Sequence, residues 1–192
     1  MLTERSMYQT IVKLNRLAEG LKRRFFVPRA QAEITGLYQT TTPLHQIPED
    51  GCYQPLPESG KWGGDGVYGW FKGSFTVPEE LAGQPLFCYP RIRFYEATLW
   101  LNGCIHSNYA AKFVEASHGN HYCNRICASA RAGETFRIDL ECYAYHRMLG
   151  TMPLDHQAQN FEYAIGPVDI CTRDDQLMQI STGPMAYSKF WA

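Results

Sequence analysis

The segment from residue 61 to residue 103 constrains the fold most strongly, because it combines an aromatic strand pattern with a hairpin signal. Val67 to Val77 (VYGWFKGSFTV) is rich in aromatic residues, which suit a pleated surface, and it predicts a β-strand. A second predicted strand, Thr98 to Leu101, runs directly into Asn102-Gly103. Asn and Gly tolerate the positive φ angles of a type I′ turn, so this pair predicts a two-residue β-hairpin.

Turn residues divide the rest of the chain at the spacing of an all-β protein. Pro78 closes the first strand, and a short helical turn over Glu79 to Leu81 is expected to end at Gly83. The other strand candidates, each bounded by turn residues, are 85–89, 94–101, 112–115, 122–128, 135–145 and 161–171. This pattern predicts a mainly β fold, a jelly-roll or galactose-binding-like β-sandwich of about eight strands.

One long helix is expected to precede the strands. Apolar residues from Met7 to Leu21 recur at spacings of three and four between Thr3, a suitable N-cap, and about Arg23. We therefore expect an N-terminal amphipathic helix over 1–25, an extended Pro-rich connector over 26–61, and a β-sandwich domain over 62–175. Because the last residues are rich in aromatic side chains, 176–192 is expected to be a truncated junction towards a missing catalytic domain.

The composition excludes several classes of protein. Hydrophobic residues make up 45% and charged residues 19% of the chain, as in globular proteins rather than disordered ones. The net charge of −1, without a concentrated basic surface, argues against nucleic acid as a partner. No apolar run is long enough to span a membrane. The seven cysteines are an odd number and scattered, which favours a reduced, cytoplasmic protein.

Several of these motifs together resemble one family of carbohydrate enzymes. The run WGGDGVYGWFKGSFTVPEELAGQPL, followed by EATLWLNG, HGNH and AGETFRIDLECYAYH, is similar to the N-terminal region of glycoside hydrolase family 38 α-mannosidases. The resemblance covers residues 3–175 and implies an N-terminal, non-catalytic β domain of a mannoside-degrading enzyme. Its partner would be the catalytic domain of the same chain, and homo-oligomer contacts or a place at the rim of the substrate cleft are further implied roles.

The resemblance assigns no catalytic residue to this chain. The family's zinc motif, His-x-Asp-x-x-Trp, does not occur in the sequence. Zinc is therefore implied only for the missing catalytic domain, and the chain itself is expected to need no cofactor and to be inert alone.

His118 and His121, with Cys123 and Cys127 nearby, form the one pattern that suggests a metal site. Their spacing fits no known zinc finger. On the strand predicted over 122–128, the two cysteines would share a face about 13 Å apart, too far to bind one ion. We therefore favour a polar loop followed by a strand with two buried thiols.

Four aromatic residues are candidates for carbohydrate contact, since aromatic rings pack against the apolar faces of sugars. They are Trp62, Tyr68, Trp70 and Trp100. Tyr68 and Trp70 are expected on the same side of their strand. Packing explains these residues equally well, and Trp62, Trp70 and Phe71 are expected to be packing anchors.

Paired carboxylates would suggest glycoside hydrolysis, but each pair here has a simpler explanation. Glu79-Glu80 lies in the predicted helical turn, Asp139 and Glu141 on the solvated face of a strand, and Asp174-Asp175 in a turn. Two other functions remain open beside the family 38 domain. One is a stand-alone carbohydrate-binding module. The other is the sugar-binding domain of a family 2 glycosidase such as a β-galactosidase, which shares the order of strand, Val-Pro turn and Asn-Gly hairpin, although the long N-terminal helix and the VYGWFKGSF run argue against it.

Overall fold

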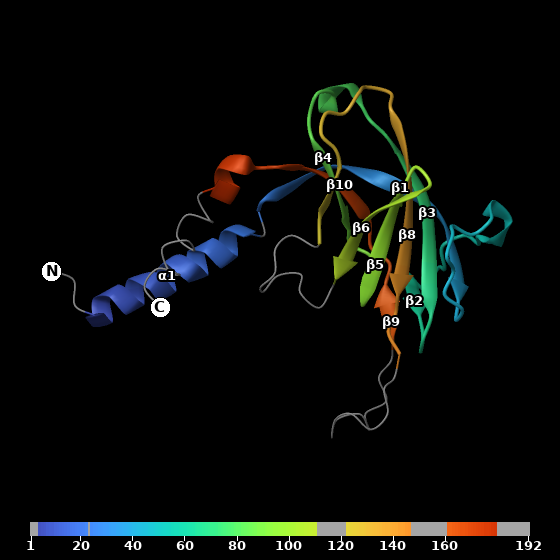
Figure 1. Cartoon of the computed structure of the whole chain (residues 1–192), viewed down its shortest axis with the longest axis horizontal. Coiled ribbons are helices and arrows are strands. Elements are labelled where there is room, and N and C mark those ends of the chain that lie inside the picture. Colours follow the sequence, from blue (N-terminus) through green and yellow to red (C-terminus); the bar gives the residue numbers. More distant parts are fainter. Residues whose placement is uncertain (1–3, 23, 111–121, 147–160, 180–192) are drawn as a thin grey trace, which may run out of the picture. The chain divides into compact units, whose positions relative to one another are not determined.

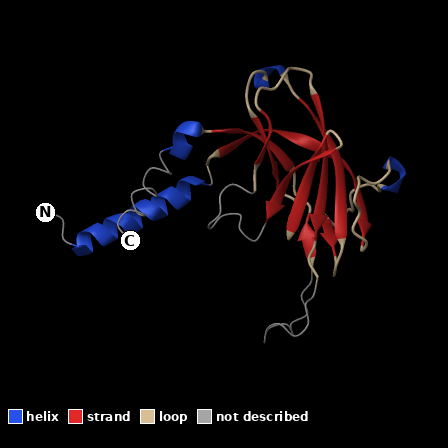
Figure 2. Cartoon of the chain, viewed as in Figure 1, coloured by secondary structure: helices blue, strands red, loops and turns tan. Residues whose placement is uncertain are grey.

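The computed structural model describes residues 4–22, 24–110, 122–146 and 161–179. The chain divides into two compact units, residues 1–27 with 172–192 and residues 28–171, which are described separately below. The fold is mainly β, as the sequence predicts, with one long helix at the N-terminus (Figure 2).

The elements are named in chain order (Figure 1). The helices are α1 (Glu4–Lys22) and two short 3-10 turns, η1 (Asp50–Cys52) and η2 (Glu79–Leu81). The strands are β1 (Phe26–Thr40), β2 (Lys61–Gly63), β3 (Tyr68–Thr76), β4 (Leu86–Pro90), β5 (Glu96–Leu101), β6 (Cys104–Ala110), β7 (Asn124–Cys127), β8 (Thr135–Tyr143), β9 (Glu162–Ala164) and β10 (Val168–Arg173).

The first unit contains α1, which confirms the predicted N-terminal helix. Its apolar residues remain partly exposed, with Leu17 at 58%. The proposed N-cap, Thr3, lies outside the described residues. In the same unit, Asp174 accepts a hydrogen bond from the Leu177 amide at 2.9 Å and so caps a short helical segment, where the sequence predicted only a turn.

The second unit is a β-sandwich formed by one folded sheet of eight strands. Their order is β6-β5-β8-β3-β1-β10-β4-β7, and β2 and β9 form a separate pair. Apolar side chains from both halves of the sheet form one core, which includes Phe71, Leu99, Leu140, Leu86 and Ile170. The Tyr109 hydroxyl of β6 donates across this core to the Cys88 carbonyl of β4 at 3.1 Å. The core thus lies between the strands of the two halves.

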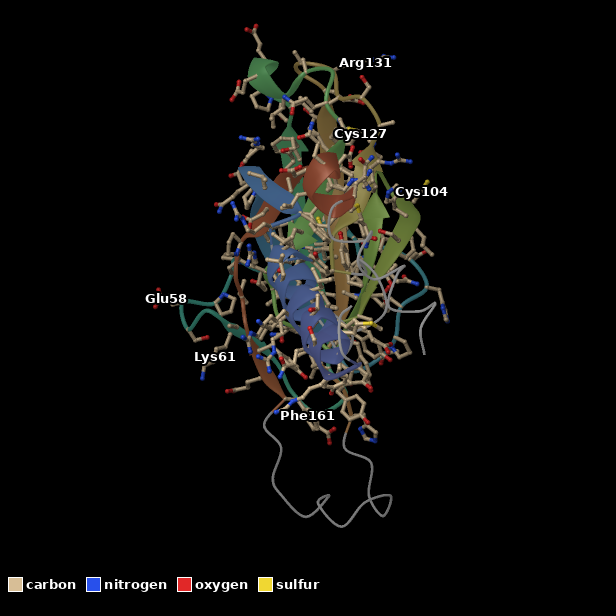
Figure 3. The ribbon with its side chains drawn as sticks, turned by 90° about the vertical axis from the view of Figure 1, so that its left-hand side faces the viewer. Glu58, Lys61, Cys104, Cys127, Arg131 and Phe161 are labelled. Atoms are coloured by element: carbon tan, nitrogen blue, oxygen red, sulfur yellow. The ribbon has the colours of Figure 1, made fainter. Side chains whose placement is uncertain are left out.

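Side chains connect the two outermost strands of the sheet. His106 Nε2 of β6 donates to the Arg125 carbonyl at 2.7 Å, and Asn124 Nδ2 donates to the Asn108 carbonyl at 3.0 Å. Figure 3 shows Cys104 of β6 and Cys127 of β7 on the same side of the molecule. These contacts nearly close the sandwich, so the free polar groups of both edge strands are partly satisfied.

Both local turns have the predicted geometry. Asn102 and Gly103 have φ angles of 51° and 84°, and they connect β5 to β6 as an antiparallel hairpin. The Asn102 side chain also accepts a hydrogen bond from the Arg137 amide of β8 at 2.9 Å. The turn η2 follows Pro78, and the chain leaves it through Gly83 at φ 79°.

Residues 26–40, which fall within the predicted connector, belong to the sheet. These residues form β1, the longest strand, which pairs with β3 and is adjacent to β10 within the sheet. Pro28 is tolerated because it lies near the beginning of the strand. Two other strand predictions also differ: β6 was not among the candidates, and the candidate over 161–171 is divided into β9 and β10. The candidate over 112–115 lies outside the described residues.

Candidate functional site

The outer face of the sheet, away from the core, contains an open depression of about 550 Å³. Strands β3, β5, β6 and β8 provide its lining. The lining residues are Tyr68, Glu96, Ala97, Thr98, Asn108, Tyr109, Ala110, Glu141 and Tyr143. We call this depression the outer-face pocket. Its volume lies within the range of about 300–1,000 Å³ that is typical of small-molecule sites.

The pairing of the strands brings these side chains together. Tyr68 is opposite Tyr143, Thr98 is opposite Glu141 on one side and Asn108 on the other, and Glu96 is opposite Tyr143. Because successive side chains of a strand point to opposite faces, the neighbours of these residues point into the core. The alternation of polar and apolar residues along β5 and β8 therefore creates both the core and the pocket.

Two tyrosines form the aromatic part of the pocket. The rings of Tyr68 and Tyr143 stack with centroids 4.7 Å apart and an angle of 26° between their planes. Both side chains are half-buried. Burial raises the pKa of the Tyr143 hydroxyl, and the neighbouring Tyr68 raises it further, so this hydroxyl stays protonated as a hydrogen-bond donor.

Glu141 provides a carboxylate beside the tyrosines. Trp100 Nε1, from the same face of the sheet, donates to its Oε2 atom at 3.4 Å. Burial raises the pKa of the Glu141 carboxyl, while the Trp100 hydrogen bond and the charge of His45 act in the opposite direction. Glu96, the second carboxylate of the pocket, is exposed.

Further along the same face the sheet is covered instead of open. Trp70 is fully buried, and its ring lies 5.7 Å from that of Trp100. Lys72 lies 5.7 Å from the centre of the Tyr53 ring and forms an ion pair with Asp50 at 2.7 Å, so the segment around η1 packs on this part of the face. The hydrogen bond from Lys72 lowers the pKa of Asp50, and the charge of Lys72 lowers it further.

Asp139 contradicts the expectation of a solvated charge. Its side chain is fully buried under this cover, and Arg137 Nε donates to its Oδ2 atom at 2.7 Å. A second Arg137 nitrogen lies 3.3 Å from Oδ1. A buried carboxylate needs such a partner, and Arg137 two residues earlier on the same face provides it. Asp139 therefore belongs to the packing of this face and is not available to a ligand.

The structure separates the four aromatic candidates for sugar contact. Tyr68 lines the outer-face pocket. Trp62 is 2% exposed on the core side, where its Nε1 atom donates to the Arg93 carbonyl at 2.9 Å and its ring packs edge-on against Phe71. Trp70 and Trp100 are buried beneath the covered part of the outer face. Trp62, Trp70 and Phe71 thus have the burial expected of packing anchors.

Sequence reasoning missed Glu96, Asn108 and Tyr143 as pocket residues. The Asn-Gly hairpin contained part of the signal, because it fixes β5 and β6 as partners and places polar residues of both strands on one face. The long-range pairing of β8 with β3 and β5 had no comparable local signal.

The metal hypothesis remains a prediction, because His118 and His121 lie outside the described residues. Among the residues described, no three His, Cys, Asp or Glu side chains are grouped closely enough to bind a metal ion. Cys123 is buried and Cys127 half-buried, and burial raises the pKa of both thiols.

Comparison with known proteins gave no family model and no curated protein that matches the chain. Among solved structures, a β-glucuronidase of Faecalibacterium prausnitzii is 14% identical over 78% of this chain and 32% of that one, with a TM-score of 0.47. A Ruminococcus gnavus β-glucuronidase bound to D-glucuronic acid gives 8% identity, 78% and 30% coverage, and a TM-score of 0.48. A putative β-galactosidase of Bacteroides fragilis gives 16% identity, 76% and 23% coverage, and a TM-score of 0.45.

This chain therefore spans a third or less of the length of each of these proteins. They are glucuronidases and a galactosidase by title, so they lend no support to the predicted α-mannosidase family. At this level of similarity they carry no argument about the function of this chain, which has to be argued from its own residues.

Proposed function

We propose that residues 28–171 form a non-catalytic, sugar-binding β-sandwich domain like that of family 2 glycosidases. The outer-face pocket would bind one or two sugar units of a glycan. The observation that carries this proposal is the stacked pair Tyr68 and Tyr143 beside the half-buried Glu141.

The chemistry of the lining matches that of a sugar. A pyranose has an apolar face of C–H groups, which packs against aromatic rings, and a rim of hydroxyls that donate and accept hydrogen bonds. Carboxylate, amide and hydroxyl side chains can bind that rim, and Glu141, Glu96, Asn108 and Thr98 provide all three types around the tyrosines. A few polar groups around an aromatic surface are the usual arrangement of a small-ligand site.

The order of elements agrees with a family 2 domain. The chain passes from β3 through the Val-Pro turn at η2 to the Asn102-Gly103 hairpin, which is the order expected of that family. The α-mannosidase resemblance includes the same order, so this order alone does not distinguish the two families. Our proposal takes the family 2 interpretation, with the catalytic domain of a longer chain as the expected partner.

Two carboxylates in one pocket also raise the question of hydrolysis. A glycosidase places its acid and its base or nucleophile on opposite sides of the bond that it cleaves. Glu96 and Glu141 instead project from neighbouring strands on the same face of one sheet. A glycan on this face would have both carboxylates on one side, which suits binding rather than cleavage.

The free cysteines agree with a cytoplasmic location, which we include in the proposal. All seven thiols are unpaired in the structure. In the described part of the chain, no helix has the length and hydropathy needed to cross a membrane.

Binding of a panel of oligosaccharides, measured by calorimetry, tests the proposed function. The chain is expected to bind at least one glycan. Tyr68→Ala or Tyr143→Ala should weaken that binding by about fivefold to thirtyfold, since a lost aromatic contact of this kind costs on the order of 1–2 kcal/mol. Tyr89→Ala is the matched control, because Tyr89 is a half-buried tyrosine of β4 in the other half of the sheet. Equal losses for all three variants, or no binding of any glycan, would overturn the proposal.

A further inference from the structure

The charges of the outer-face pocket point to the class of sugar that it binds. We infer that the pocket selects uncharged pyranosides and rejects uronic acids. This inference rests on the proposed function and specifies its ligand.

The charged side chains that line the pocket are both acidic. Glu96 extends from β5 and Glu141 from the neighbouring strand β8. Among the lining residues that the structure describes, none is a lysine or an arginine. Proteins that bind a carboxylate-bearing ligand usually provide such a cation, most often an arginine with its two parallel N–H donors. This pocket presents the opposite charge.

The basic residues of β3 and β8 are engaged elsewhere. Lys72 forms its 2.7 Å ion pair with Asp50, and Arg137 donates twice to the buried Asp139. Both pairs lie in the part of the face that the segment around η1 covers, away from the pocket lining. His45 is the basic group whose charge acts on Glu141, but its side chain is exposed and does not line the pocket. Among the residues that the structure describes, a sugar carboxylate in the pocket would therefore face Glu96 and Glu141 without a dedicated counter-charge.

The need of the two carboxylates for hydrogen-bond donors also favours neutral sugars over uronic acids. An ionised carboxylate only accepts hydrogen bonds, so Glu96 and Glu141 need donors on the ligand. Every hydroxyl of a neutral sugar can supply one. The carboxylate of a uronic acid supplies none, and like charges placed close together across an interface discriminate strongly against the wrong partner.

The test compares sugars that differ only in this group. Methyl glycosides and short oligosaccharides of glucose, galactose and mannose are paired with their glucuronate, galacturonate and mannuronate counterparts, and affinities are measured at pH 8, where histidine side chains are ordinarily neutral. The full chain is expected to bind the neutral member of its preferred pair about tenfold or more tightly. Glu141→Gln and Glu96→Gln should each reduce the ratio of the affinity for the neutral sugar to the affinity for its uronate. Glu79→Gln, an exposed carboxylate in η2 outside the lining, should leave it unchanged.

The outcomes separate this inference from the proposed function. Binding of a uronate as tightly as its neutral counterpart, or a ratio that both glutamine variants leave unchanged, would overturn the neutral-sugar inference and leave sugar binding intact. Failure of both members of every pair to bind would overturn the proposed function, and this inference with it.

Discussion

Tyr68 and Tyr143 stack across the β3–β8 pair, with ring centroids 4.7 Å apart. They lie where the outer face of the sheet passes from its covered part to its open part. Two residues further along both strands, Trp70 and Glu141 are opposite each other, and beyond them Asp139 is completely buried. The same face is thus covered at one end by the segment around η1 and open at the other. The stacked tyrosines lie at the open end, where a ligand has access.

Gly69 should be one of the positions in β3 least tolerant of a side chain. An added Cβ atom would lie 2.5 Å from Cε3 of Trp62, whose ring is held by its hydrogen bond to the Arg93 carbonyl. We expect Gly69→Ala to lower the free energy of unfolding by about 1–3 kcal/mol, the usual cost of overpacking a core. Urea denaturation measures this loss.

Gly20→Ala is the control for that substitution, because no atom lies within 4 Å of the added Cβ atom in α1. An alanine there should leave stability unchanged or raise it by up to about 1 kcal/mol, the difference in helix propensity. If Gly69→Ala were as stable as Gly20→Ala, the packing of Trp62 against β3 would be incorrect.

The buried Arg137–Asp139 pair predicts an asymmetry between two truncations. Arg137→Ala leaves the fully buried Asp139 carboxylate without its partner and should cost about 3–5 kcal/mol. Asp139→Ala leaves a guanidinium that is 42% exposed and can be hydrated, so its cost should be smaller. Chemical denaturation of both variants tests the order. The exposed pair of Asp65 with His146 provides the reference, and Asp65→Ala should cost less than about 1 kcal/mol.

The type I′ turn at Asn102-Gly103 can be tested with substitutions that differ in how well they tolerate a positive φ angle. Gly103 has a φ of 84° with open space around it, so a larger residue would be strained by its backbone and not by a clash. Gly103→Val should lower the melting temperature, with a loss of roughly 1–2 kcal/mol. Gly103→Asn, which tolerates positive φ, should lose distinctly less. Unchanged melting of the valine variant would exclude the type I′ turn.

The ionised Glu141 side chain should lower the free energy of unfolding at neutral pH, because burial raises the pKa of its carboxyl in the folded chain. Above that raised pKa the folded state carries a poorly solvated charge, and this cost disappears as the pH falls below the ordinary value of 4.5, where the group is protonated in both states. Glu141→Gln should therefore be more stable than the wild type at pH 7, and the difference should shrink at pH 4.

Urea titrations at the two pH values measure that difference. The amide side chain of the Glu141→Gln variant would still offer an oxygen to Trp100 Nε1, so the substitution changes charge more than packing. A variant less stable than the wild type at pH 7 would contradict the account. A gain in stability with weaker glycan binding is the pattern expected of a residue retained for function.

The sequence predicted the features that depend on neighbouring residues. The hairpin at Asn102-Gly103, the turn at η2 and the strand β3 follow from turn chemistry and side-chain alternation over a few positions. The helix α1 follows from its apolar periodicity. These signals were sufficient for the mainly β fold class.

Features that depend on distant segments were missed. β1 looked like a connector because its pairing with β3 and its place beside β10 are set by residues far along the chain. Asp139 appeared to lie on a solvated face, but the segment around η1 covers this part of the sheet. Within the pocket, Tyr68 was identified as a candidate, whereas Glu96 and Asn108 are brought to it by the register of β5 with β8 and β6.

The most direct test of sugar binding on the outer face is an NMR titration of the isotope-labelled chain with the tightest-binding neutral oligosaccharide. The account predicts saturable shifts of the amides of Tyr68, Thr98, Asn108 and Glu141, which line the pocket, and little change in β4 and β10 of the other half of the sheet. Shifts concentrated in β4 and β10, or no saturable shift at the pocket residues, would contradict it.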